Sequence, residues 1–142
     1  MVKVSQLLAL KHSGVITIPP ETSVLKALQM MADHNVGALP VVQAEHLVGI
    51  FSERDYARKV VLLGKNSTQT SVSEIMSEKV FTVDPDSTVE DCMHMMSDKR
   101  IRHLPVLEGS KLVGILSIGD LVKTIIQEQS FHIEQLESYI KT

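Results

Sequence analysis

Apolar and polar residues follow the same succession in both halves of this chain. In each half a short apolar run stops at proline, an amphipathic segment follows, and two apolar runs separated by polar residues come next. Residues at helical spacing form the apolar face of each amphipathic segment: Val24, Ala27, Leu28 and Met31 in the first half, and Val89, Cys92, Met93 and Met96 in the second. Each half therefore predicts the order strand, helix, strand, strand, helix, with these apolar faces in the core.

The two halves are copies of one another. Thr17–Arg58 aligns with Thr82–Lys123 without a gap at an offset of 65 positions, and both copies contain Leu-Pro-Val and Leu-Val-Gly-Ile. The segments before the copies also correspond, since Val4–Leu7 resembles Val72–Ile75 once three extra residues near His12 are allowed. Two copies are too few for a solenoid, so we expect a pseudo-twofold pair.

Turn and proline signals set the expected limits of the strands. Short strands are predicted at 15–18 and 80–83, where the following proline supplies no backbone donor to continue a ladder. A hairpin is predicted from the apolar runs 38–42 and 47–52, and copy two has the polar residues 108–111 at the corresponding turn.

Helix starts are signalled by hydroxyl side chains. Copy one has Thr22 or Ser23 before its first helix, and copy two has Ser87, with Glu90 three residues on as the partner in a capping box. The second helix of each copy is expected to begin directly after Ser52 or Ser117.

The stretch Asp120–Ile140 continues past the second copy. Its apolar residues recur at steps that suit a long amphipathic helix: Val122, Ile125, Ile126, Ile133, Leu136 and Ile140. Two interpretations stay open, because this helix either docks on its own module or extends a dimer interface.

Composition narrows the classes of function. A net charge of -3 provides no basic field for nucleic acid. The single cysteine, Cys92, falls on an apolar helix face, so a packed thiol in a reducing compartment is expected. No run reaches the roughly 18 apolar residues that span a bilayer and no cleavable leader is evident, which predicts a cytoplasmic protein that is not in the membrane. The histidines apart from His103 share no metal-ligand spacing, so no metal is expected: His12, His34, His46, His94 and His132.

The candidate chemistry lies where the last strand of each copy meets its second helix. Both copies have Gly, Ser and Asp at steps of three: Gly49, Ser52 and Asp55, then Gly114, Ser117 and Asp120. A helix N-terminus offers unpaired N–H groups and a partial positive charge, which favour phosphate, and the Ser hydroxyl adds a donor. The Asp carboxylate can accept hydrogen bonds from ribose hydroxyls. The pattern indicates a site that binds a sugar and its phosphate together.

The same Ser-x-x-Asp pattern can cap a helix without any ligand. Its recurrence at identical spacing in both copies, each time after a Gly-containing apolar strand, favours a ligand site. Neither serine has a histidine at a spacing that indicates a nucleophile and its base. Catalysis on a nucleotide has little support, since Glu53 beside Arg54 is the only nearby acid that could act as a base.

Taken together, these features resemble the CBS-domain family, named for cystathionine beta-synthase, and specifically its small stand-alone bacterial and organellar members with two motifs. The resemblance is carried by the strand-proline-helix opening, the Leu-Pro-Val strand preceded by Gly37-Ala38 or Arg102-His103, and the Gly-h-x-Ser-x-x-Asp ending, where h is apolar. It covers nearly the whole chain. It implies an α/β fold in which two pseudo-symmetric β-α-β-β-α motifs pack sheet to sheet as one module (a Bateman module), with a long C-terminal helix.

The expected boundaries are 1–64 for motif one with its lead-in, 65–127 for motif two with its linker, and 128–142 for a helical extension. The resemblance further implies two clefts between the motifs that hold AMP, the first candidate, or ADP, ATP or NAD. Asp55 and Asp120 are expected on the ribose, with Ser52 and Ser117 near the phosphate. The other expected ligand-binding residues line the adenine pocket or face the phosphate: Thr17, Val36, Gly37, Ala38, Leu39, Arg54, Thr82, Ile101, Arg102, His103 and Leu104.

The two expected sites differ in charge. Copy one has Gly37-Ala38 where copy two has Arg102-His103, and Arg54 of copy one is replaced by Gly119 in copy two. We therefore expect two unequal sites, without a prediction of which one dominates.

The prediction for function is a regulatory sensor and not an enzyme. The chain has no effector domain beside the repeats, so its output is expected to pass to an unidentified partner protein, and family members commonly pair as flat dimers, which predicts a homodimer. The alternative is a ligand-free structural interaction module in which the Ser-x-x-Asp pairs only cap helices.

Overall fold

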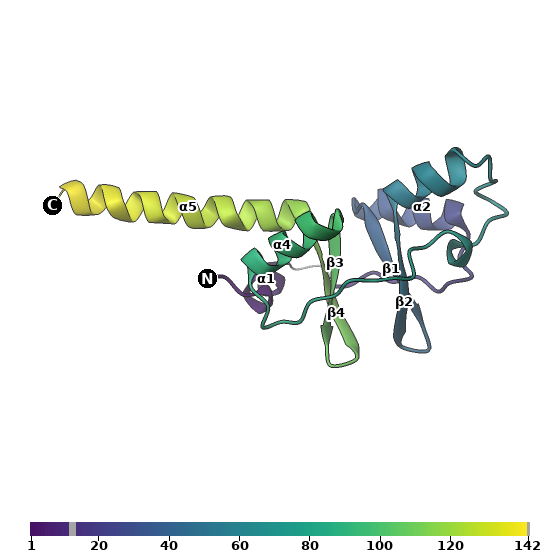
Figure 1. The fold of residues 1–142 in the computed structure, drawn as a ribbon, viewed down its shortest axis with the longest axis horizontal. Coiled ribbons are helices and arrows are strands. Elements are labelled where there is room, and N and C mark those ends of the chain that lie inside the picture. The colour runs from purple at the N-terminus through teal and green to yellow at the C-terminus, as the bar shows by residue number, and fades with distance from the viewer. Residues whose placement is uncertain (12–13, 142) are drawn as a thin grey trace.

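The computed structural model describes residues 1–11 and 14–141; His12 lies outside these residues. Each copy of the repeat folds around a two-stranded antiparallel hairpin with its first helix packed on it (Figure 1). In copy one the hairpin is β1 (Ala38–Gln43) and β2 (His46–Ser52), and the helix is α2 (Val24–His34). The expected hairpin is confirmed, and Ala44 and Glu45 make its turn with positive φ angles of 50° and 67°.

Copy two repeats this arrangement. Its elements are α4 (Val89–Lys99), β3 (His103–Glu108) and β4 (Lys111–Ser117), and both helices end on a left-handed residue, Asn35 or Arg100. β2 contacts β4, so the two hairpins lie side by side in the middle of the molecule (Figure 1). The predicted α/β fold of two pseudo-symmetric motifs is confirmed.

The second helices start where predicted but differ in form. After Ser52, copy one has only a short α3 (Glu53–Asp55), which continues as a π-helix over Tyr56–Val61. After Ser117, copy two has the long α5 (Ile118–Lys141).

The strands predicted at 15–18 and 80–83 are reduced to single bridges. Ile18 pairs with Val41 in parallel, and Val83 pairs with Val106 in the same way. The prediction of regular strands was therefore wrong. The prolines at 19 and 20 and at 85 end the pairing after one residue, because proline has no N–H to donate.

The first helix of copy two begins one residue later than predicted. Thr88 is the N-cap, and its side chain accepts from the backbone N–H of Asp91, whose carboxylate accepts from the N–H of Thr88. Ser87 instead belongs to a turn with Asp84. The capping box predicted from Ser87 and Glu90 was wrong, because Thr88 and Asp91 offer the same chemistry one position on. In copy one, Ser23 is the N-cap, the second of the two residues expected there.

Each motif has its own hydrophobic core, and each core is completed by the lead-in of the other motif. Val4 and Leu7 of α1 (Val4–Leu10) pack in the core of copy two. Val72 and Ile75, in and after a 3₁₀ turn over Val72–Glu74, pack in the core of copy one. The similarity of these lead-ins therefore reflects an exchange: the chain before each motif folds onto the opposite one.

The exchanged lead-ins approach the sheets at equivalent glycines. A Cβ on Gly114 would lie 2.5 Å from Cδ2 of Leu8, and a Cβ on Gly49 would lie 2.5 Å from Sδ of Met76. Real Cβ atoms do not tolerate such distances, so the glycine in each Leu-Val-Gly-Ile strand makes room for a side chain of the lead-in.

The long helix α5 leaves the body of the molecule and projects from it (Figure 1). Leu121 and Thr124 are buried on the second motif, but Ile126, Ile133, Leu136 and Ile140 are exposed. The interpretation that this helix docks along its own module is wrong for its outer part, because no other element of the described chain covers that apolar stripe.

Candidate functional site

In copy one the Ser-x-x-Asp pair closes on itself. The hydroxyl of Ser52 accepts from the N–H of Asp55 at 3.2 Å, and Oδ2 of Asp55 accepts from the N–H of Ser52 at 2.9 Å. This is a complete capping box at the start of α3.

The other oxygen of Asp55 is also occupied. Oδ1 accepts from the hydroxyl of Ser77 at 3.1 Å and lies 3.4 Å from Nζ of Lys59. Asp55 is only 8% exposed, so its carboxylate is enclosed by protein partners on both oxygens.

In copy two the corresponding carboxylate is more open. Ser117 and Asp120 form the same reciprocal pair, at 2.9 and 3.1 Å. Oδ2 of Asp120 also accepts from Nζ of Lys11 at 2.8 Å. Among the described residues, Oδ1 of Asp120 has no hydrogen-bond partner, and the side chain is 26% exposed compared with 10% for Asp55.

The two sites use different groups at equivalent positions. In copy one, Ser77 donates its backbone N–H to the carbonyl of Ile50 and its hydroxyl to Asp55. In copy two, the ammonium of Lys11 donates both to the carbonyl of Ile115, at 2.9 Å, and to Asp120. A neutral residue of one lead-in is thus matched by a charged residue of the other.

The motifs meet at the strand ends beside these helix starts. A Cβ on Gly37 would lie 3.4 Å from the imidazole of His103, so the residue just before β1 faces the first residue of β3 across the pair of motifs. Nη1 of Arg54 donates to the carbonyl of Arg100 at 2.8 Å. Arg54 is therefore committed to the second motif, and the central region combines residues from both copies.

Burial and charge shift two pKa values in copy two. The pKa of His103 is lowered, chiefly because burial disfavours the imidazolium, and Lys11 and Arg102 act in the same direction against the opposing charge of Asp120. Burial acts to raise the pKa of Asp120, but the hydrogen bond from Lys11 and those from Ser117 outweigh it, so the pKa is lowered. At neutral pH the site therefore holds a neutral imidazole near a carboxylate and the Lys11 ammonium.

The remaining predicted residues divide by exposure. Leu39 and Leu104 lie in the two cores, and Ala38 is also buried, so these side chains fill the motifs. The others are at least partly accessible: Thr17, Val36, Gly37, Ser52, Arg54, Thr82, Ile101, Arg102, His103 and Ser117. Of these, Gly37 and His103 approach one another directly.

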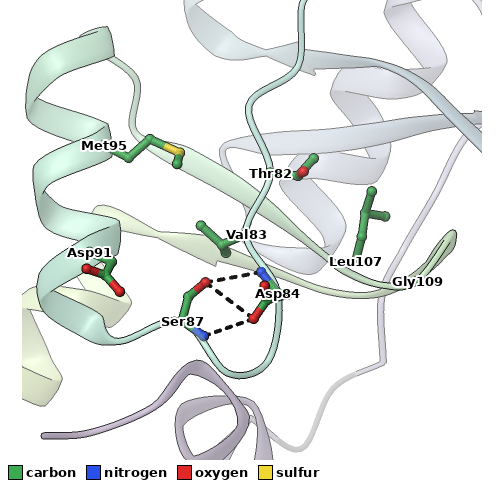
Figure 2. A pocket seen from close by; sticks show the side chains of 8 residues that line it. All are labelled: Thr82, Val83, Asp84, Ser87, Asp91, Met95, Leu107 and Gly109. Atoms are coloured by element: carbon green, nitrogen blue, oxygen red, sulfur yellow. Dashed lines mark hydrogen bonds between the residues drawn. The ribbon is translucent and has the colours of Figure 1, made fainter.

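A separate hollow of about 560 Å³ lies at the turn end of β3 (Figure 2). It is bounded by Thr82, Asp84 and Ser87 on one side, with Asp91 and Met95 of α4 opposite. Thr82 is the only predicted ligand-binding residue among its lining residues. Because Ser117 pairs with His103 at the other end of β3, this hollow is distinct from the Ser-x-x-Asp start of α5.

Three residues that contact the carboxylates of Asp55 and Asp120 were not identified from the sequence: Lys11, Lys59 and Ser77. Lys59 follows Asp55 by one helical turn, and that spacing is a signal that could have found it. Lys11 and Ser77 carry no such signal, because their positions depend on which motif each lead-in joins.

Cys92 is buried in the core of copy two, as its place on the helix predicted. Burial raises the pKa of its thiol to about 11, and the charges of Asp91 and Asp84 add to this. The thiolate that reacts with oxidants is thereby disfavoured at neutral pH.

The fold defines a class of protein in which two α/β motifs exchange their lead-ins, and the second helix of each motif starts at a Ser-x-x-Asp pair. The chain belongs to the CBS domain family: the family model matches residues 5–62 and 72–127. The match is to a regulatory domain and not to a catalytic family.

Relatives and solved structures agree with this assignment. The chain is 40% identical over 126 residues to the CBS domain-containing protein CBSX3, mitochondrial, of Arabidopsis thaliana, with 85% of this chain and 61% of that protein covered. It is similar to the structure of a putative signal-transduction protein with CBS domains from Burkholderia ambifaria, with 44% identity, a TM-score of 0.86, and 90% and 96% of the two chains covered. The chain thus spans somewhat less than two thirds of the length of the Arabidopsis relative.

A more distant structure holds ligands. The CBS domain pair of protein MJ0100, solved in complex with 5′-methylthioadenosine and S-adenosyl-L-methionine, is 27% identical with a TM-score of 0.78, and 90% of this chain and 98% of that one are covered. In the part of this chain that the structure describes, no helix has the length and apolar character to cross a membrane.

Proposed function

We propose that this chain is a regulatory module that binds an adenosine-containing ligand at the start of α5, and that ligand occupancy controls a partner protein. Membership of the CBS domain family supports the regulatory class. The adenosine-containing ligands of the related domain pair support the ligand class.

The observation that carries the proposal is the difference between the two aspartates. Both oxygens of Asp55 are engaged by Ser52, Ser77 and Lys59. Asp120 has one oxygen without a partner among the described residues and a more exposed side chain. A ribose hydroxyl can donate to that free oxygen without breaking a protein contact, so we place the stronger site in copy two.

The surroundings of Asp120 suit a phosphate as well as a ribose. Lys11 brings an ammonium to Asp120, and Ser117 directly precedes the first residue of the helix. Arg102, the neighbour of His103 in the sequence, is exposed. A helix start with adjacent cations favours an anion. AMP is the first candidate, with ADP, ATP and NAD next, and copy one offers a weaker second site.

Calorimetry and thermal unfolding with each adenosine compound test this proposal. A ligand at a hundredfold excess over its dissociation constant stabilises the fold by about 2.7 kcal/mol, which raises the melting temperature by several degrees. Asp120→Ala should weaken binding at least about tenfold through loss of a charge-assisted hydrogen bond. Asp91→Ala, which removes an exposed capping carboxylate of α4, is the control and should leave affinity unchanged.

The second candidate is a ligand-free interaction module. It is favoured by the reciprocal Ser-x-x-Asp pairs at the starts of α3 and α5, since these carboxylates cap the helices without a ligand. Flat titrations with AMP, ADP, ATP, NAD, 5′-methylthioadenosine and S-adenosyl-L-methionine would establish it and end the sensor proposal.

We also propose that the module acts as a homodimer in the cytoplasm. The family commonly pairs its modules, and a CBS-CP12 protein similar to this chain, at 28% identity and a TM-score of 0.76, is described as hexameric. Sedimentation and fractionation test these two points separately.

A further inference from the structure

The outer part of α5 carries a stripe of heptad positions that is apolar except at Gln129. Its positions alternate in steps of four and three along the helix: Val122, Ile126, Gln129, Ile133, Leu136 and Ile140. In heptad terms, isoleucine occupies all three a positions, at 126, 133 and 140, and the d positions are Val, Gln and Leu. Within parallel coiled coils, β-branched residues at a with leucine at d favour two strands, and Leu136 is the leucine d position of this stripe.

This stripe is uncovered in the single chain. Ile126, Ile133, Leu136 and Ile140 are 57%, 55%, 63% and 80% exposed. The face of α5 turned toward the body is a different one, since Thr124 and Phe131 line a hollow of about 300 Å³ that they share with Leu10 of α1. At 100° per residue this face and the heptad stripe lie on nearly opposite sides of the helix.

The flanking charges favour one orientation of a pair. In a parallel coiled coil each g residue faces the e residue that follows it by five positions on the partner helix. His132 is at g and Glu137 is at e, so an imidazole N–H can donate to a carboxylate across the pair, twice by symmetry. An antiparallel pair sets e beside e and g beside g, and both contacts are lost.

The polar residues of the helix disfavour a lipid partner. Helices that lie on membranes carry lysine and arginine on the polar face. Here the polar positions between 127 and 138 hold Glu128, Glu134 and Glu137 and contain no lysine or arginine.

We infer that the outer part of α5 pairs with α5 of a second copy as a parallel, in-register coiled coil that begins near Ile126. The inference deepens the proposed homodimer and does not depend on nucleotide binding. Two chains joined in this way place the second motifs of both copies at the same end of the coil, on either side of its axis.

Sedimentation velocity on the full chain tests the stripe. Ile133→Glu puts a charge into an a position that is exposed in the single chain, so the fold should persist while self-association weakens about tenfold or more. Ser138→Glu adds the same charge on the outer side of the helix and should leave association unchanged. Equal association of the two variants, or a wild-type chain that stays monomeric at high micromolar concentration, would overturn the inference.

Disulfide trapping tests the orientation. Gln129→Cys at a d position places two thiols side by side in a parallel pair, and mild oxidation should give a covalent dimer. In an antiparallel pair over the same stripe, position 129 lies opposite position 133, so the two thiols are displaced by about one helical turn along the axis and cannot join. The wild-type chain, whose Cys92 is buried, is the control. Absence of a covalent dimer from Gln129→Cys would exclude the parallel arrangement.

Nucleotide titration of Ile133→Glu separates this inference from the proposed function. Unchanged adenosine-ligand binding with weakened association supports the coiled coil and leaves the sensor proposal intact. Lost association in a chain that binds no nucleotide at all would support the coiled coil alone.

Discussion

The ammonium of Lys11 lies 2.8 Å from Oδ2 of Asp120, although 109 positions separate the two residues in the sequence. The contact exists because α1 packs in the core of the second motif. The N-terminal lead-in thereby supplies a cation to the helix start that we propose as the stronger ligand site.

Replacing Lys11 with methionine should destabilise the fold by about 1–2 kcal/mol, the range expected for a partly buried hydrogen bond to a charged group. The variant keeps the apolar stem but removes the donor to both Asp120 and the carbonyl of Ile115. Urea unfolding measures the loss, and Lys26→Met, at an exposed position of α2, is the control.

The sign of the pH dependence provides a second check on this ion pair. The pKa of Asp120 is lowered in the fold. The stability that its carboxylate contributes is therefore fully present above the ordinary pKa of an aspartate and is lost as the pH falls through the lowered pKa of the folded protein. The stability gap between wild type and Lys11→Met should therefore shrink in acid. A gap that is constant from neutral pH to pH of about 3 would show that Lys11 stabilises the fold through the carbonyl of Ile115 and not through Asp120.

The hairpins could be predicted from the sequence because their signals are local. Apolar runs separated by a short polar segment specify β1 and β2, and the same pattern at offset 65 specifies β3 and β4. The starts of the helices were predictable to within one residue, and the error at Ser87 arose where Ser and Thr stand side by side.

The exchange of the lead-ins could not be predicted. The similarity of Val4–Leu7 to Val72–Ile75 indicates that the two segments have equivalent structural roles. It does not identify the motif on which each segment packs. The inequality of the two carboxylates depends on that choice, because Ser77 and Lys11 come from the lead-ins. Two unequal sites were expected from Gly37-Ala38 against Arg102-His103 and from Arg54 against Gly119, whereas the difference between the two carboxylates arises from the lead-ins.

Gly114→Ala should destabilise the fold by about 1–3 kcal/mol, as overpacking does in other cores. Its new Cβ would lie 2.5 Å from Cδ2 of Leu8, so the methyl group would push α1 away from β4. Leu8→Ala in the same chain removes the colliding atoms, and the double variant should be more stable than the sum of the two single losses. Additive losses would show that Leu8 and Gly114 do not pack together.

Gly49→Ala should be harder to rescue than Gly114→Ala. Its Cβ would meet Sδ of Met76 at 2.5 Å and also the backbone carbonyl oxygen of Ser77 at 3.1 Å. Met76→Ala removes the side chain but leaves the carbonyl, which is held by its hydrogen bond from the N–H of Ile50. Thermal unfolding of the four single and two double variants gives the comparison, and an equal rescue at both glycines would contradict it.

His103→Gln should reduce the loss of stability in weak acid. The pKa of His103 is lowered, first by burial and then by Lys11 and Arg102, so the unfolded chain takes up a proton at a higher pH than the fold does. The stability that His103 contributes is fully present above the ordinary histidine pKa of about 6.5. It falls as the pH drops toward the lowered pKa of the folded protein. Urea unfolding from pH of about 7.5 to 5 should show a shallower decline for His103→Gln than for wild type.

The matched control for this pH series is His46→Gln, because His46 is exposed at the hairpin turn. That variant should follow the wild-type decline. If His103→Gln follows it too, the imidazole takes up its proton in the fold as readily as in the unfolded chain, and His103 is not a neutral group beside Asp120.

Asp55→Ala should cost more stability than the loss of any other capping carboxylate in the chain that the structure describes. Its carboxylate accepts from Ser52 and Ser77 and lies beside Lys59, so alanine leaves three groups without their partner in a site that is only 8% exposed. Unsatisfied buried groups cost about 1–3 kcal/mol each, and partial hydration of Lys59 limits the total to about 2–4 kcal/mol.

Asp91→Ala removes the equivalent carboxylate from the exposed capping box of α4 and should cost about 1 kcal/mol or less. The loss of stability from Asp120→Ala should fall between those of the other two variants. Lys11 loses its partner, but one oxygen of the Asp120 carboxylate has no partner among the described residues and so loses no contact. Urea unfolding ranks the three variants, and the ranking bears on function because a carboxylate fully used by the fold is unavailable to a ribose. If Asp120→Ala proved as costly as Asp55→Ala, both aspartates would be structural to the same degree, and the reason for placing the stronger ligand site in copy two would be lost.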